Sequence, residues 1–182
     1  MNGINAFDGT IMDFIQRWFH NIVTDSVFPV ITYLGEAGAV WLLLAAAFLL
    51  QKSTRRRGIL MVCAIAAGFL TGEVLLKNIV CRERPFQMFP NYTSLLISPP
   101  SGFSFPSGHT CASFAAATVL CRESRKWGVP ALVLALLIGF SRIFLFVHWT
   151  TDVLAGMALG IFFGLLTCWV AAKLEQRKAI KN

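Results

Sequence analysis

The chain has 182 residues, of which 56% are hydrophobic and 14% are charged, and its formal net charge at pH 7 is +7. Soluble domains carry about a quarter of charged residues, so this depletion argues against a water-soluble globular protein. Apolar runs recur, and about 20 helical residues cross the roughly 30 Å hydrocarbon core of a membrane. The composition therefore predicts an all-α, polytopic membrane helical bundle.

The first predicted element is an amphipathic helix over Asp8–Val23. Its apolar side chains at helical spacing are Ile11, Phe14, Ile15, Trp18, Phe19 and Ile22, and its other face carries Asp13, Gln16, Arg17, His20 and Asn21. Such a helix either lies on the outer membrane interface or packs sideways on the bundle, and the pattern leaves both alternatives open.

About five transmembrane helices are predicted next, at Leu34–Gln51, Gly58–Lys77, Pro106–Cys121, Trp127–Val147 and Trp149–Ala172. The third run is the shortest and needs its flanks or a tilt to span the membrane. In the last run, Gly156, Gly160 and Gly164 form a stripe that permits close helix contact, expected within the chain rather than between two copies. Residues 1–182 are expected to form a single membrane-embedded domain, with an interfacial segment over 1–33 and a transmembrane core over 34–174.

Eleven of the 16 lysine and arginine residues lie on one side of this alternating topology. They follow the first, third and fifth predicted helices: Lys52, Arg55, Arg56, Arg57, Arg122, Arg125, Lys126, Lys173, Arg177, Lys178 and Lys181. This is the positive-inside pattern, which places these tracts in the cytoplasm and explains the net charge without nucleic acid. The expected location is the cell (plasma or inner) membrane, with the opposite helix ends, and the Cys81–Phe105 loop between them, facing the periplasm or exterior.

Three polar motifs lie at those outward helix ends. They are Lys77-x6-Arg84-Pro85, Pro106-Ser107-Gly108-His109 and Ser141-Arg142-x5-His148-x3-Asp152. Because each lies at the end of an apolar run, the fold can bring all three to one membrane face. Together they supply cations, a helix N-terminus, two imidazoles and a carboxylate, which are groups that phosphoryl transfer can use without a metal.

Two of the motifs suggest specific chemistry. His148 and Asp152 are four residues apart, so on a helix they are neighbours on one face. The carboxylate can then accept a hydrogen bond from Nδ1–H and leave Nε2 as a nucleophile, although a histidine capped at a helix start is an equal alternative. The segment Ser107-Gly108-His109 after Pro106 reads as a helix start, whose free N–H groups bind anions.

The remaining cations are less specific when each is taken alone. Arg142 lies in an apolar run and must find an anion or a polar cavity. Lys77 ends an apolar helix and could extend its amine to the interface. Glu73 precedes it by four residues and is expected to be its structural partner rather than a catalyst.

Taken together and in this order, K-x6-R-P, P-S-G-H and S-R-x5-H-x3-D resemble the signature of the type 2 phosphatidic acid phosphatase superfamily, at every signature position from Lys77 to Asp152. The resemblance implies that His148 is the nucleophile that forms a phosphohistidine and that Asp152 orients it. It implies that His109 protonates the leaving group and then activates water. It also implies no metal, no cofactor and a phosphate cradle made of Lys77, Arg84, Ser107, Gly108 and Arg142.

The expected function is hydrolysis of a phosphate or pyrophosphate group on a lipid. Undecaprenyl pyrophosphate is favoured, because five spans plus an interfacial helix resemble the shorter undecaprenyl-pyrophosphate phosphatases of this superfamily; phosphatidylglycerol phosphate or phosphatidic acid is the alternative. Two other classes are a vanadate-dependent haloperoxidase, disfavoured by the membrane-embedded chain, and a catalytically dead lipid-binding or transport protein, disfavoured by the intact triad. The partners are the lipid substrate and the membrane, and the oligomeric state is left open.

Overall fold

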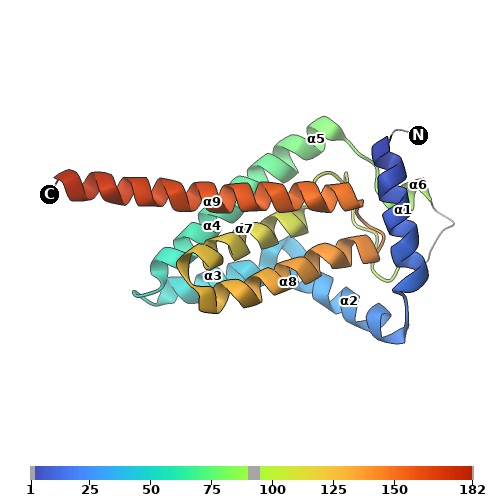
Figure 1. Ribbon diagram of the computed structural model, residues 1–182, viewed down its shortest axis with the longest axis horizontal. Helices are drawn as coiled ribbons and strands as arrows, with labels where there is room; N and C mark the ends of the chain where they lie inside the picture. The colour runs from blue at the N-terminus through green and yellow to red at the C-terminus, as the bar shows by residue number, and fades with distance from the viewer. Residues whose placement is uncertain (1–2, 90–94, 182) are drawn as a thin grey trace.

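The regular structure of the chain is helical throughout the part that the computed structural model describes, residues 3–89 and 95–181 (Figure 1). The longer helices are α1 (Gly3–Trp18), α2 (Ile22–Leu34), α3 (Ala39–Leu50), α4 (Arg55–Phe69), α7 (Gly108–Glu123), α8 (Arg125–Phe144) and α9 (Thr150–Lys181). The short ones are η1 (Glu36–Gly38), the π-helical η2 (Leu70–Leu76), α5 (Lys77–Val80) and α6 (Pro85–Met88). A helix occupies each of the five predicted apolar runs, so the all-α prediction is confirmed for the described ranges.

Three stretches of the described chain are long and apolar enough to cross a membrane: Arg55–Met88, Arg125–Phe144 and Thr150–Ile180. A fourth crossing results if α2 and the segment from η1 through α3, bent by 46° relative to each other, form one span. Helix α7 has 16 residues, fewer than the roughly 20 that a perpendicular span needs. The structure therefore supports a multi-pass helical protein, and the exact count of five spans stays a prediction.

Helix α7 is the centre of the bundle, packed against α4, α8 and α9. Its interior positions are small, and Ala115, Ala116 and Ala117 are completely buried. Small side chains allow neighbouring helices to approach closely, which is how helices associate where apolar burial alone drives little. A hydrogen bond of 2.9 Å from Trp41 Nε1 to Ser113 Oγ joins α3 to the same core.

The glycine stripe of α9 packs on α7 of the same chain, as predicted. A Cβ atom at Gly156 would lie 2.5 Å from the carbonyl oxygen of Ser107, and one at Gly160 would collide with the backbone at Cys111. Gly164 meets α7 just as closely one turn later. The two backbones thus touch over two helical turns, and this contact fixes how the start of α9 sits beside the start of α7.

The amphipathic helix predicted over Asp8–Val23 is wrong beyond Trp18, where α1 ends. Asn21 instead begins α2, since its side chain accepts hydrogen bonds from the backbone N–H groups of Val23 and Thr24 at 3.0 and 3.1 Å. Such a cap satisfies amides that have no partner inside a helix, and it stabilises the start of a new helix over continuation of the old one.

The continuous helix predicted from Leu34 to Gln51 is also interrupted, at η1. Ala37 and Gly38 have φ values of 48° and 70°, in the left-handed region that a helix cannot use. Helix α3 starts only after this break. The bend brings Glu36 to the wall of the cavity described below.

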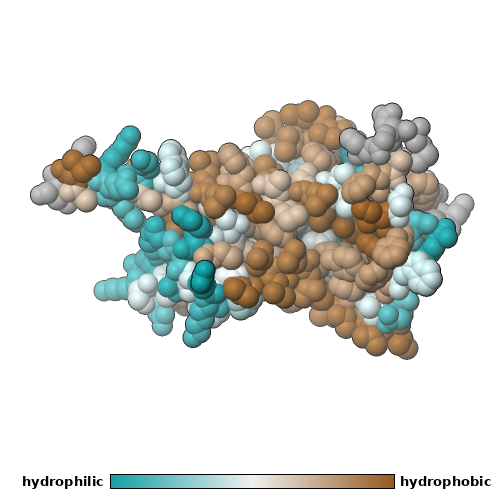
Figure 2. Space-filling model, viewed as in Figure 1, coloured by the Kyte–Doolittle hydropathy of each residue, from teal (hydrophilic) through white to brown (hydrophobic). Residues whose placement is uncertain are grey.

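Apolar side chains cover much of the bundle's flank, and polar residues gather at one end, beside the carboxyl-terminal half of α9 (Figure 2). There Arg56 of α4 forms ion pairs with Glu123 of α7 and, at 3.0 Å, with Glu175 of α9. The basic tracts therefore share one end of the molecule, as the charge pattern predicts. Helices α1 and α6 lie at the other end (Figure 1).

Helix α1 contacts α8 and α9 at that other end. Met12 and Ile15 are buried against the bundle, whereas Phe14 and Trp18 are 53% and 75% exposed. The helix thus packs on the bundle with one face and presents aromatic side chains on another. Its position in a membrane interface stays a prediction.

Candidate active site

A cavity of about 400 Å³ lies among the helix ends that carry the three motifs. Six of the eight predicted site residues line it: Lys77, Arg84, Gly108, His109, Arg142 and His148. The other two, Ser107 and Asp152, are fully buried next to it. The structure therefore brings the predicted residues of all three motifs together, while their individual roles stay predictions.

His148 lies in the turn between α8 and α9 and has a different partner at each ring nitrogen. Its Nδ1 faces Asp152 Oδ2 at 3.6 Å, an ion-pair separation longer than a hydrogen bond. Its Nε2 lies 3.2 Å from Nη1 of Arg84. Asp152 is fixed in turn because its Oδ2 accepts the backbone N–H of Trp149 at 2.9 Å. The carboxylate is thus on the correct side of the ring to orient it, and Nε2 points to the cationic side of the cavity.

The surroundings of His148 favour the neutral imidazole. Burial, followed by the positive charges of Arg142, Arg84 and Lys77, holds the pKa of His148 well below its usual value. A neutral ring keeps a lone pair on one nitrogen, which a nucleophile requires.

Arg84 is only 3% exposed and is held by backbone carbonyl groups. It donates from Nε to Gly102 at 2.9 Å, from Nη1 to Val147 at 2.9 Å and from Nη2 to Ser101 at 3.2 Å. Because neutral carbonyls do not cancel its charge, the guanidinium keeps its attraction for an anion in the cavity. A buried cation of this kind is costly unless such a partner binds.

Ser107 and Gly108 form the start of α7, as the Pro-Ser-Gly-His pattern predicts. The Ser107 hydroxyl caps the helix and accepts a hydrogen bond from Thr110 Oγ1 at 2.9 Å. Its backbone N–H donates to the Asp152 carbonyl at 3.1 Å, which ties the starts of α7 and α9 together. A side chain at Gly108 would displace the Glu73 carboxylate, so glycine leaves the helix N-terminus open toward the cavity with Glu73 in its present place.

Lys77 forms an ion pair of 2.7 Å with Glu73, the structural partner expected from the sequence. Both residues line the cavity. Glu73 lies inside the π-helical turn η2, a wide turn that is common at functional sites and that the apolar pattern does not reveal.

Two further contacts supply residues that the sequence patterns missed. Glu36 Oε2 lies 3.3 Å from Nε2 of His109. Arg142 donates from Nη1 to the buried Thr32 Oγ1 at 2.6 Å, and its Nε has no hydrogen-bond partner among the described residues. Arg142 therefore does find the polar cavity that its apolar run required, and one of its donors is left for a ligand.

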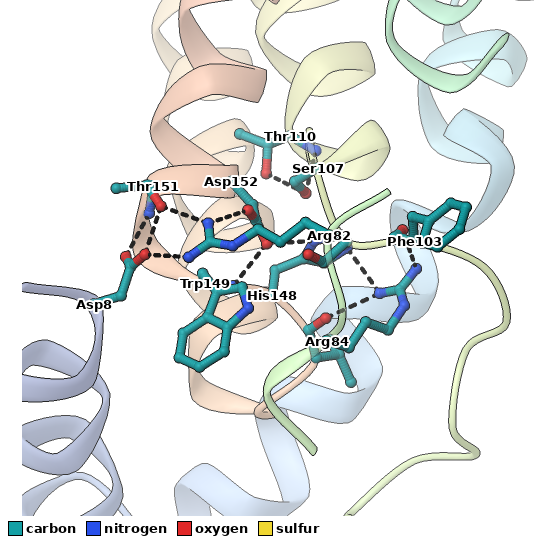
Figure 3. Close-up of polar contacts among 12 residues, drawn as sticks. Asp8, Arg82, Arg84, Phe103, Ser107, Thr110, His148, Trp149, Thr151 and Asp152 are labelled. Carbon is teal, nitrogen blue, oxygen red and sulfur yellow. Dashed lines mark hydrogen bonds and ion pairs between the residues drawn. The ribbon is translucent and has the colours of Figure 1, made fainter. Parts of the chain in front are cut away.

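Two charged residues behind the site were also not predicted as members of it. Arg82 occupies one of the unspecified positions inside the first motif and contacts Asp152, and Asp8 of α1 contacts Arg82 (Figure 3). No motif spacing connects Asp8 to a site more than 70 residues away in the chain.

Within the described ranges, no cluster of three or more His, Cys, Asp or Glu side chains could hold a metal ion. The absence of a metal requirement stays a prediction. A second cavity, of about 440 Å³, lies between α1 and the side chains of Phe89 and Trp149. It contains none of the predicted site residues in its wall, so the smaller cationic cavity is the candidate active site.

Comparisons with known proteins agree with this geometry. Residues 56–176 match the PAP2 superfamily. The chain is 35% identical over 143 residues to an undecaprenyl-diphosphatase of Sulfolobus acidocaldarius, over 75% of this chain and 68% of that protein. It is 32% identical over 147 residues to the undecaprenyl-diphosphatase BcrC of Bacillus subtilis, over 81% of this chain and 75% of that protein. The solved transmembrane PAP2-type phosphatidylglycerolphosphate phosphatase of Bacillus subtilis aligns with a TM-score of 0.77 at 27% identity, over 95% of this chain and 88% of that chain.

Proposed function

The chain belongs to the PAP2 superfamily and is a membrane lipid phosphatase, and we propose that its physiological substrate is undecaprenyl pyrophosphate. The relatives named as undecaprenyl-diphosphatases support this choice, at 32–35% identity over about three quarters or more of the chain. Phosphatidylglycerol phosphate is the second candidate, because the solved phosphatidylglycerolphosphate phosphatase shares the fold over nearly the whole chain.

The observation that carries the catalytic proposal is the placement of His148 between a carboxylate at Nδ1 and a guanidinium at Nε2. In the first step, Nε2 attacks the terminal phosphorus, and an N–P bond forms as the bridging P–O bond breaks. His109 gives a proton to the departing oxygen, and Asp152 stabilises the charge that develops on the attacking ring. Arg84 turns its Nη1 donor from His148 to the phosphate oxygens, so binding of the substrate frees the nucleophile.

In the second step, water attacks the phosphohistidine. His109 accepts a proton from the water, the N–P bond breaks and inorganic phosphate leaves. The cradle that holds the phosphoryl oxygens through both steps consists of Lys77, Arg84, Ser107, Gly108 and Arg142. Cationic side chains and backbone N–H groups can stabilise the transferring group in the manner of an oxyanion hole.

A panel of lipid substrates tests the function. Phosphate release by the purified protein should be fastest with undecaprenyl pyrophosphate, slower with phosphatidylglycerol phosphate and phosphatidic acid, and unchanged by EDTA. A preference for a glycerol lipid would reverse the substrate assignment. If EDTA abolished the activity and Mg²⁺ restored it, the metal-independent mechanism would be contradicted. If no lipid released phosphate, a lipid-binding or transport protein would be favoured.

We also propose that α7 is a fifth membrane crossing and that the cavity opens to the periplasm or exterior. The support for this orientation is the set of basic tracts at the opposite end of the bundle. The predicted outer loop runs through Asn91–Ser101, where 91–94 lie outside the described residues; Ser98 is described and exposed.

Cysteine labelling tests this orientation. In a cysteine-free background, Ser98→Cys should react with a membrane-impermeant maleimide on intact cells, because the probe reaches only the outer side. The control Gln176→Cys, on the exposed end of α9, should react only after permeabilisation. The reverse pattern would place the substrate in the cytoplasmic leaflet.

A further inference from the structure

A buried chain of charged groups connects α1 to Asp152, and phosphate binding does not explain it. Arg82 donates from Nη1 to Asp152 Oδ1 and from Nη2 to Asp8 Oδ2, both at 2.7 Å (Figure 3). Both carboxylates are completely buried. Neither Arg82 nor Asp8 lines the cationic cavity, so the two lie behind the site rather than in it.

Asp8 also holds the first turn of α9, the helix that carries Asp152. Its Oδ1 accepts the backbone N–H of Thr151 at 2.9 Å, and its Oδ2 accepts the Thr151 hydroxyl at 2.6 Å. The free N–H groups of a helix start need such partners, and a carboxylate is among the best of them. A residue of α1 therefore caps α9 from a distance of 143 positions in the chain.

Arg82 is held from three sides. Its two Nη atoms contact Asp8 and Asp152, Nη1 also contacts Thr151 Oγ1 at 2.7 Å, and its guanidinium carbon lies 5.0 Å from the ring centre of Trp149. A planar guanidinium fixed in this way presents its donors in one direction only. It therefore sets the rotation of the Asp152 carboxylate: Oδ1 stays with Arg82, and Oδ2 stays with the Trp149 amide and Nδ1 of His148.

We propose that Arg82 and Asp8 are positioning residues of the active centre, and that α1 is thereby a part of the active site as well as a peripheral helix. The inference rests on the role proposed for Asp152 in the phosphatase reaction. Arg82 holds the orienting carboxylate toward the nucleophile, and Asp8 holds Arg82. Both carboxylates are buried and the half-buried Arg82 lies between them, so loss of Arg82 leaves two buried charges without their cation, and loss of Asp8 leaves Nη2 of Arg82 without its carboxylate.

The test uses matched pairs of substitutions. Asp8→Asn and Arg82→Gln remove the charges of the Asp8–Arg82 pair. The control variants Asp13→Asn and Arg17→Gln do the same to an exposed pair of 2.8 Å within α1. Supporting partners of catalytic ligands are typically worth about 10–100-fold, a figure known from metal sites. We expect kcat to fall by about this factor in the buried-pair variants with KM unchanged, and both control variants to match the wild type.

Three further measurements separate positioning from loss of folding. Rapid-quench phosphorylation of His148 should slow by the same factor as kcat in the folded fraction. The double variant Asp8→Asn/Arg82→Gln should be no slower than Arg82→Gln alone within a few fold, because the two residues act in series. Arg82→Lys keeps the charge but not the planar fork, so it should fold as the wild type does and still show a reduced kcat.

Several results would overturn the proposal. These are a wild-type kcat in folded Arg82→Gln and Arg82→Lys, a raised KM with unchanged kcat, or a loss that follows only the folded fraction. If Arg82→Gln and Asp8→Asn fail to fold, the kcat of Arg82→Lys decides alone. An inactive wild type would instead contradict the phosphatase function, so the two failures are distinguishable.

Discussion

Replacement of His148 by alanine is expected to reduce phosphate release to background. Without the ring, no N–P bond can form at this position. In a serine protease, loss of the nucleophile costs about 10⁶-fold in kcat, and a loss of that order is expected here. Binding should persist, because the cationic cradle is untouched.

The measurement is single-turnover hydrolysis of a labelled lipid pyrophosphate. The matched control is His20→Ala, since His20 lies outside the cationic cavity, 2.7 Å from Asp25 and stacked on Phe144. His20→Ala should keep wild-type turnover. Phosphoenzyme in His148→Ala, or label on a third residue in the wild type, would show that another group is the nucleophile.

Replacement of His109 by alanine is expected to slow hydrolysis in a different way. The nucleophile remains, but the leaving oxygen receives no proton, and general acid help is typically worth about 10²–10⁴-fold. Hydrolysis with a lipid alkoxide as leaving group, which needs that proton, should slow by a factor near the top of this range. A phosphate leaving from a pyrophosphate, or p-nitrophenolate, has a low pKa, so hydrolysis with these leaving groups should slow much less.

With a substrate whose leaving group has a low pKa, hydrolysis of the phosphohistidine becomes the slow step in His109→Ala. Water attack on the phosphohistidine loses its base, so an acid-labile phosphoenzyme should accumulate, and it should be absent in His148→Ala. Rapid quench followed by acid treatment measures it. An equal loss of rate for good and poor leaving groups, with no accumulated intermediate, would contradict the acid–base role of His109.

The candidate cavity could be predicted from the sequence because its residues lie at helix ends. Apolar runs determine where helices end, the basic tracts determine which ends share a side, and the motif spacing determines which residues lie at those ends. The pairing of His148 with Asp152 follows from a separation of four residues at a helix start. These are local or periodic features, which a single sequence displays directly.

The remaining contacts could not be predicted because they depend on tertiary packing. In the sequence, Asp8 is an ordinary polar residue at the start of the predicted amphipathic helix, and its contact with Arg82 spans 74 positions in the chain. The left-handed backbone at Ala37 lies in a sequence that otherwise continues a helix, and that break brings Glu36 beside His109. Asn21 is a residue type that caps helices, but the apolar period continues across it to Ile22, so the period alone predicts one helix.

The glycine stripe allows α9 only a few separate positions along α7, and this restricts the spacing of the catalytic groups that the two helices carry. Where two backbones touch without intervening side chains, a small sliding motion meets backbone atoms instead of flexible rotamers, so the helices have no gradual way to shift. The next position that would seat the stripe again is a full turn away, about 5.4 Å along the axis. Such a step would carry the start of α9, with Asp152, away from the start of α7, where the Ser107 amide donates to the Asp152 carbonyl at 3.1 Å. The active centre is therefore either assembled or absent, and heat or detergent that parts α7 from α9 should abolish turnover in a single cooperative transition.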